Sequence, residues 1–428
     1  MIKRILILVA FFPLFLKAQD KQSMKILFDS LKTHPQTKAG EINMEKALAG
    51  KKIAYGMLYP GIDLFGAYNY SSSPSGMLPI APNELLGMVK DQSVAQPFSE
   101  NILRAGASIS MPIFVKSIYT MAAKAKTMYK SAEQKNYIDL LKNEALLVSL
   151  NANLKYMNQM IIALEKKKQS IVKTKEIIAI KVNNQRTPKS ALLKINNAIN
   201  QIELSKSGIE LKRSEALSMI QSLTGIYLKK EIEMHQNGTY TNSDFAALNP
   251  LRLKIEAEKL GARAEKEKLY PILVARGDYN HSMAKAYNNG GDVNKDFTAI
   301  NLVLKVPLFQ KTQYSKITMA NLEVKSLENN LAQKEIELSA QAKQLQIELE
   351  ILENQVQLYK ESLKDKEGLL KVAKVAYSSN RMTIEDYLKY EDDLVLEQSK
   401  YYKTEAEKWQ ALMKLAVIYG NNIENLVE

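Results

Sequence analysis

Two stretches of this chain are almost free of the residues that interrupt helices. The segment from Ile113 to Thr187 contains neither glycine nor proline, and the segment from Leu308 to Glu428 contains no proline and only two glycines. Both are rich in Ala, Leu, Lys, Glu and Gln, which favour helices. A helix of about 65 residues is roughly 100 Å long, which exceeds the width of a globular domain. These segments therefore predict very long helices in an extended coiled-coil body.

The spacing of apolar residues supports this prediction. In the first stretch Leu140, Leu147 and Leu154 recur every seven residues, and Leu345 and Leu352 do the same in the second. Such spacing places apolar side chains on one face of a helix, where a neighbouring helix can cover them. Polar residues break the pattern, so a simple two-stranded rod is not favoured.

Four other segments alternate between apolar and polar residues, as β-strands do. They span residues 62–70, 104–111, 272–281 and 298–306. They have 8 to 10 residues, close to the length of about 9–11 residues of a tilted strand that crosses a membrane. The loops between them, residues 71–101 and 282–296, are rich in Gly, Pro, Asn and Ser. An ordinary antiparallel sheet with one solvated face is the alternative interpretation.

The chain is internally duplicated. The motif Met-Pro-Ile-Phe at 111–114 lies 195 positions before Val-Pro-Leu-Phe at 306–309, and Gly225 lies 195 positions before Gly420. A Tyr-Pro pair precedes the first strand of each half, at 59–60 and 270–271. Each half therefore reads as a lead-in helix, two strands, a very long helix, a turn and a return helix.

We expect the chain to have three parts. These are a signal peptide at 1–18, a first repeat at 19–245 and a second repeat at 246–428. Lys3 and Arg4 precede an apolar run at 5–16, and Ala18 follows, which is typical of a secretory signal. The alternative interpretation of this segment is an uncleaved membrane anchor. No later apolar run is long enough for a transmembrane helix, and the chain has no cysteine.

The strand count constrains the function. Four strands are too few to close a membrane barrel, and lipid does not tolerate open strand edges. Strands in a membrane would therefore have to be pooled between chains. Three copies would supply twelve strands, and their long helices would continue the barrel as a tube. Such an assembly is a conduit.

At these residues the sequence resembles the TolC family of outer-membrane efflux proteins, over nearly the whole chain from Met24 to Gly420. The Tyr-Pro pairs, the apolar-Pro-apolar-Phe motifs and the segment Tyr377 to Leu388 carry the resemblance. That segment is similar to the family turn Tyr-x-x-Gly-x-x-Thr-x-x-Asp-x-Leu, with Asn380 in place of glycine. Asparagine also tolerates the left-handed conformation that a glycine adopts.

The resemblance implies a fold and a role. It implies long antiparallel helical hairpins forming a periplasmic α-barrel, with four strands per chain in a 12-stranded trimeric outer-membrane β-barrel. It also implies a passive channel of a tripartite export system, opened at its helical tip by a periplasmic adaptor and an inner-membrane pump. Asp386 falls on an acidic aperture position, whereas Lys389 replaces a further aperture acid. Helix capping is the alternative role for each turn residue.

The predicted site residues fall into two groups. The periplasmic tip would comprise Asn184, Arg186, Pro188, Asn380, Arg381, Thr383, Asp386 and Lys389. The strand-to-helix junctions would comprise Pro112, Phe114, Pro307 and Phe309. Pro188 could start the first return helix. Ala191 stands where the second turn has Asp386, so we expect the two turns to differ.

Other functions find little support in the sequence. The net charge of +13 comes from lysines spread along helices among glutamates, so we expect no nucleic-acid partner. His34, His235 and His281 lie far apart, and neither a metal site nor a cofactor motif is expected. No nucleophile or acid–base constellation indicates an enzyme. A periplasmic coiled-coil adaptor remains the alternative, although an adaptor normally has a single helical hairpin.

Overall fold

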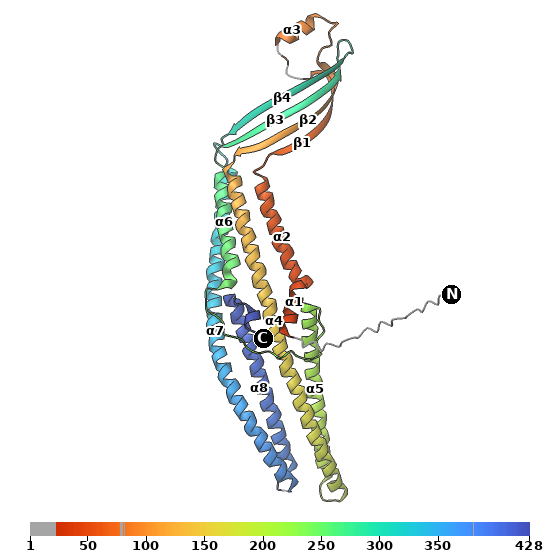
Figure 1. Ribbon diagram of the computed structural model, residues 1–428, viewed down its shortest axis with the longest axis vertical. Helices are drawn as coiled ribbons and strands as arrows, with labels where there is room; N and C mark the ends of the chain where they lie inside the picture. The colour runs from red at the N-terminus through yellow and green to blue at the C-terminus, as the bar shows by residue number, and fades with distance from the viewer. Residues whose placement is uncertain (1–22, 78–79, 81, 380) are drawn as a thin grey trace, which may run out of the picture.

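The computed structural model describes residues 23–77, 80, 82–379 and 381–428. The molecule is long and narrow, with a β-sheet at one end and two helical turns at the other (Figure 1). The predicted signal peptide at 1–18 and the turn residue Asn380 lie outside the described residues.

Two helices run most of the length of the molecule. Helix α4 spans Lys116–Asn183 and helix α7 spans Lys311–Ser378, each with 68 residues. At 1.5 Å per residue each is about 100 Å long. This confirms the prediction from the segments without glycine and proline.

Each long helix turns back into a return helix of 36 residues, α5 over Lys189–Thr224 and α8 over Ile384–Tyr419. Each return helix ends at a glycine with φ of 73°, Gly225 and Gly420, a left-handed conformation that suits glycine. The bounds of α5 and α8 differ by 195 residues, as do those of α4 and α7. The duplication is thus a repeat of structure as well as of sequence.

The lead-in segments differ between the halves. The first comprises two helices, α1 over Met24–Thr33 and α2 over Pro35–Gly56, whereas the second is the single helix α6 over Asn249–Glu267. Pro35 has no backbone N–H to donate, so it begins a new helix rather than continuing α1. Short 3₁₀ turns, η1 and η2, lie at Ala246–Leu248 and Ile423–Asn425.

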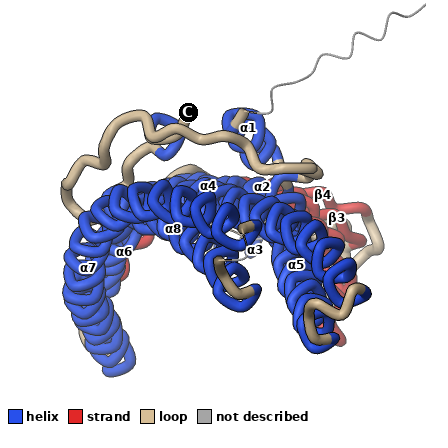
Figure 2. The backbone as a smooth tube through the Cα atoms, turned by 90° about the horizontal axis from the view of Figure 1, so that it is seen from below, coloured by secondary structure: helices blue, strands red, loops and turns tan. Residues whose placement is uncertain are grey.

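The helices form one curved layer. Near the turns, α7, α8, α4 and α5 pack side by side in that order, and nearer the sheet the order is α7, α6, α4 and α2. Helix α1 and the C-terminal segment lie on the convex side of this layer (Figure 2). The main hydrophobic core lies beneath them and includes Phe28, Leu147 and Leu415.

The four described strands form one antiparallel sheet in the order β1-β2-β3-β4. They span Gly61–Gly76, Phe98–Phe114, Ile272–Lys285 and Asp292–Lys305. The strands are longer than predicted, and the first predicted loop contains a helix, α3 over Pro82–Lys90. Because β1 is an edge strand, it tolerates Pro74, and its pairing resumes at Ser75 after an irregularity.

Among the described residues, no helix has both the length and the apolar character that crossing a membrane requires.

Candidate functional site

The β-sheet has one apolar face. Strand pairing aligns Ile62 on β1 with Ile109 on β2, Gly277 on β3 and Ile300 on β4. Side chains two residues along a strand share its face, so Leu64 lies on the same face. Leu64 is 84% exposed and Ile300 is 83% exposed. In the described part of the chain, no helix packs across this sheet (Figure 1). An exposed apolar face of this kind is typical of a surface that contacts a partner or a membrane.

The opposite face of the sheet is largely polar, although Phe65, Val274 and Val303 also lie on it. Asp63 on β1 is aligned with Ser108 on β2 and Asp278 on β3, and Arg276 on β3 is aligned with Asn301 on β4. An ordinary sheet solvates its polar face and packs its apolar face on a core. Here no described helix covers either face, which fits contact with lipid on the apolar side and water on the polar side.

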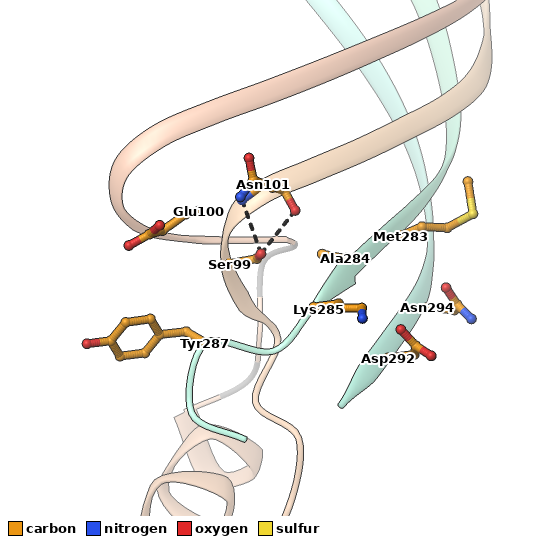
Figure 3. A pocket seen from close by; sticks show the side chains of 9 residues that line it. All are labelled: Ser99, Glu100, Asn101, Met283, Ala284, Lys285, Tyr287, Asp292 and Asn294. Atoms are coloured by element: carbon orange, nitrogen blue, oxygen red, sulfur yellow. Dashed lines mark hydrogen bonds between the residues drawn. The ribbon is translucent and has the colours of Figure 1, made fainter. Parts of the chain in front are cut away.

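An open hollow of about 790 Å³ lies at the end of the sheet that is away from the long helices. Figure 3 shows that its lining comes from β2, β3 and β4 and is largely polar. The Ser99 hydroxyl donates to the Asn101 carbonyl at 3.0 Å and accepts from the Asn101 N–H at 3.2 Å. Glu100, Lys285 and Asp292 add charges to the lining. Nowhere in the described residues do three or more His, Cys, Asp or Glu side chains gather as metal ligands.

The loops beyond this hollow are tied together by Asn288. Its side-chain amide donates to the carbonyls of Gln92 and Val94, and its side-chain oxygen accepts from the N–H of Gln96, all within 3.0 Å. The β3–β4 loop of the second half thereby holds the long β1–β2 loop of the first half in place. Sequence reasoning did not identify this contact.

The two helical turns at the other end share an equivalent backbone hydrogen bond. In the first, the Arg186 N–H donates to the Lys181 carbonyl at 2.8 Å, and Gln185 has φ of 59°. In the second, the Arg381 N–H donates to the Ala376 carbonyl at 2.9 Å. In the first turn this bond closes the helix end through the left-handed Gln185. Asn184, Arg186 and Arg381 are exposed.

The turns differ where the return helices begin. Thr383 precedes α8, and its hydroxyl accepts from the Asp386 N–H at 3.2 Å while donating to the Asp386 carboxylate at 2.7 Å. Pro188 is the equivalent residue before α5, which begins at Lys189. Proline has no side-chain oxygen to accept such a bond, and Ala191 replaces Asp386. The two turns therefore differ, as expected, because α8 begins with a side-chain helix cap and α5 does not.

The two hairpins also contact each other near the turns. Lys194 on α5 forms an ion pair with Glu385 on α8 at 2.7 Å, with both side chains more than half exposed. The hydrogen bond from Lys194 lowers the pKa of the Glu385 carboxyl. Lys389 is exposed on α8, where it adds to Lys366 in lowering the pKa of Asp393. The surface near the turns therefore carries charges of both signs.

A buried polar cluster lies just behind the turns. The Tyr387 hydroxyl and the Ser170 hydroxyl both donate to one oxygen of Glu391 at 2.6 Å. Tyr387 is 2% exposed and stacks on Tyr377 with ring centroids 5.1 Å apart. Burial, assisted by the Glu391 bond, raises the pKa of Tyr387 to about 12. The cluster fixes α8 to α4. Its sequence signal was a Tyr and a Glu four residues apart on one helix face, which we did not single out.

The predicted junction residues lie at the opposite end of the long helices. Phe114 ends β2, whereas Pro307 and Phe309 lie between β4 and α7. Pro112 lies inside β2, where it pairs with Val274 of β3 but lies beyond the last β1 pair at Ser110. Its missing N–H therefore removes no bond to β1. The structure gathers the predicted residues at two separate ends of the molecule.

Solved outer-membrane channels share this fold. The Campylobacter jejuni CmeC outer membrane channel matches with a TM-score of 0.75 and 16% identity, covering 93% of this chain and 85% of that one. The outer membrane protein VceC of Vibrio cholerae matches with a TM-score of 0.76 and 13% identity, covering 93% and 96%. The open Neisseria gonorrhoeae MtrE outer membrane channel matches with a TM-score of 0.71 and 12% identity, covering 93% and 88%.

Comparison of the sequence with models of known protein families and with curated proteins found no match. At these identities the likeness to solved structures shows the fold. It confirms the fold of one chain that the resemblance to the TolC family implies.

Proposed function

We propose that three copies of this chain form an outer-membrane channel, a passive conduit from the periplasm to the exterior. The observation that carries this proposal is the sheet with one apolar and one polar face, neither covered by a helix within the described residues. In a closed barrel the apolar face would contact lipid and the polar face would line the water-filled lumen.

The open edges support assembly. In the described sheet β1 and β4 each have a partner on one side only. The helical layer ends on the same two sides, with α2 and α5 on the β1 side and α7 on the β4 side. A ring in which β4 and α7 of one copy meet β1, α2 and α5 of the next would pair every strand.

Apolar side chains on the outermost helices support the same arrangement. Leu204 and Leu211 on α5 are 67% and 69% exposed, and Ile336 and Val372 on α7 are 71% and 68% exposed. A neighbouring copy would cover them. The number three rests on the resemblance to the TolC family and on the twelve strands that three copies would supply. Smaller numbers of strands close less readily around a lumen.

The helical turns would form the periplasmic tip. Exposed groups at this end, among them Arg186, Arg381, Asp386 and Lys389, would line an aperture and meet an adaptor protein joined to an inner-membrane pump. The hydrogen bonds between Thr383 and Asp386 support helix capping, the alternative role, for those two residues. Helix capping and a role at the aperture are compatible. A coiled-coil adaptor is less favoured, because the fold carries two helical hairpins and an uncovered sheet.

Each part of the chain would have a role in this channel. The signal peptide at 1–18 would direct export, and the repeats 19–245 and 246–428 would each supply one sixth of the ring. The junction residues Pro112, Phe114, Pro307 and Phe309 would lie near the membrane surface. The channel would need no cofactor or nucleic acid and would catalyse no reaction.

Cell fractionation combined with gel electrophoresis of heated and unheated samples tests this proposal. A trimeric channel should fractionate with the outer membrane and migrate as a high-mass species that becomes monomeric on boiling. A soluble monomer in the periplasmic fraction would contradict the proposal.

A further inference from the structure

An apolar groove with a cationic rim lies between α2, α4 and α6, close to the sheet. Its volume is about 770 Å³, within the range of small-molecule sites. Its lining residues come from α2, α4 and α6 and from the positions that follow α2 and α6.

The groove opens on the concave face of the helical layer. On α4, Tyr137 donates to the Gly420 carbonyl at 3.2 Å, and Gly420 begins the C-terminal segment on the convex side (Figure 2). The groove residues Met128 and Lys135 are nine and two residues away from Tyr137. At 100° per residue they lie about 180° and 200° around the helix from it. In the proposed ring, the concave face lines the tunnel.

The floor of the groove is apolar and adaptable. Ile53 of α2 and Met57, which follows α2, contribute to it, as do Met121 and Met128 of α4. Ile53 is 65% exposed, Met57 56% and Met121 39%. Methionine side chains are flexible and polarizable, so they fit apolar groups of varied shape.

The rim of the groove is positively charged. Lys124 and Lys268 line it, but they pair with Glu258 at 2.8 Å and Glu265 at 2.6 Å. Lys51 lies 5.5 Å from the centre of the Tyr129 ring.

Two further lysines lie on the rim of the groove. Lys135 and Lys254 are exposed and form no ion pair with any described residue. Within the described lining residues there is no acidic side chain. An anionic head group would therefore find at least two available ammonium groups beside an apolar floor.

We propose that this groove binds amphipathic anions, molecules with an apolar body and one carboxylate, sulfonate or phosphate, as they pass through the tunnel. The inference rests on the proposed channel function, and it names the substrate class of that channel. A cation of the same shape would meet the repulsion of the lysines. A small inorganic anion would gain nothing from the apolar floor.

The test uses the purified full-length protein in lipid nanodiscs, with empty nanodiscs as blanks. Pyrenebutyrate is the anionic probe, and a pyrenebutyl trimethylammonium is the matched cation. Fluorescence titration should show saturable binding of the anion and at least about tenfold weaker binding of the cation. Inorganic phosphate should not displace pyrenebutyrate at equal concentration.

Two double variants locate the site. Lys135→Gln with Lys254→Gln should weaken pyrenebutyrate binding about tenfold or more. Lys126→Gln with Lys130→Gln, exposed on the other face of α4, should leave it unchanged. Met121→Gln with Met128→Gln should weaken binding of both probes. Equal binding by wild type and the Lys135/Lys254 variant, or equal binding of the two probes, would overturn the inference.

Conductance of the same samples in planar bilayers, without probe, separates the two proposals and reports correct assembly of each variant. Conduction without selective anion binding would contradict the proposal that the groove binds anions and would support the channel. Selective binding without conduction would support the groove as a binding site and contradict the channel.

Discussion

Thr383 and Asp386 hydrogen-bond to each other twice at the start of α8. The Thr383 hydroxyl accepts from the Asp386 backbone N–H at 3.2 Å and donates to the Asp386 carboxylate at 2.7 Å. Both side chains are exposed at the turn end of the molecule. Asp386 therefore contributes a negative charge to the proposed aperture and a partner to the helix cap, and the two contributions can be separated by substitution.

Asp386→Ala should leave assembly intact. In planar bilayers it should change the ion conductance of the channel and the block of that conductance by added cations, called cation blockade below. Asp386→Asn should have a similar effect on blockade, because it removes the charge and keeps a side-chain oxygen near Thr383. Thr383→Val should cost about 1 kcal/mol of helix stability through loss of the cap and leave cation blockade unchanged. If both Asp386 variants conduct and are blocked like the wild type, the residue is only a helix cap.

Gln185 adopts a left-handed conformation, with φ of 59°. For residues other than glycine and asparagine, the left-handed conformation costs roughly 1–2 kcal/mol. Gln185→Gly should therefore stabilise the first turn by about 1 kcal/mol and slow hydrogen exchange at the Arg186 amide. Asn184→Gly, at φ of −86°, provides the control and should give no such gain. Faster exchange at Arg186 in Gln185→Gly would contradict this account of the turn.

Gly225 and Gly420 occupy equivalent positions but have different surroundings. A Cβ on Gly420 would lie 2.5 Å from the Ala246 Cβ, whereas on Gly225 the nearest atom would be 4.0 Å away, on His34. Alanine at either site would bear left-handed strain of about 1–2 kcal/mol. Gly420→Ala should be the more destabilising because it adds a steric clash. The temperature at which the assembled protein dissociates should fall further for Gly420→Ala, and an equal fall would exclude the clash.

Glu144 on α4 is 3% exposed beneath α1 and the C-terminal segment. Burial raises the pKa of its carboxyl to about 7, Glu424 adds to the effect, and Lys32 opposes it. Between about pH 4.5 and 7 the unfolded chain releases this proton and the folded chain retains it. The unfolded chain then binds fewer protons, so stability falls as the pH rises through this range, by about 3 kcal/mol at most.

Glu144→Gln should remove this loss. The variant should dissociate at a higher temperature than wild type at pH 8, and the two should agree near pH 4.5. Glu133→Gln, exposed on the same helix, should leave the wild-type pH dependence in place. A wild-type stability that rises between pH 5 and 8, with no change in Glu144→Gln, would contradict the assignment.

The helices could be predicted from the sequence because their signal is local. The absence of glycine and proline over 113–187 placed α4, and the 195-residue offset placed α7. The full lengths of the strands could not be predicted in this way. Residues 71–74 are Ser-Ser-Ser-Pro and show no alternation, yet they lie within β1 because an edge strand accepts proline and an irregular register.

The candidate site was predicted in part. The turn pattern identified Thr383 and Asp386, whose contact is local in sequence. Ser170 and Glu391 are 221 residues apart, and their bond depends on how α4 packs against α8. The Asn288 contacts likewise join loops nearly 200 residues apart. A single sequence carries no local signal for contacts of this kind.

A disulfide scan between β1 and β4 tests the proposed ring most directly. The natural chain has no cysteine, and β1 and β4 are not neighbours within the described sheet. Leu64→Cys on β1 would be combined in turn with Ile300→Cys, Leu302→Cys and Leu304→Cys on β4, because the stagger between copies sets which pair meets. Single-cysteine variants serve as controls.

Oxidation in intact cells should cross-link at least one pair into a ladder that ends at three copies and runs with the outer membrane. Only monomers for every pair, or a ladder that continues beyond three copies, would contradict the closed trimeric channel.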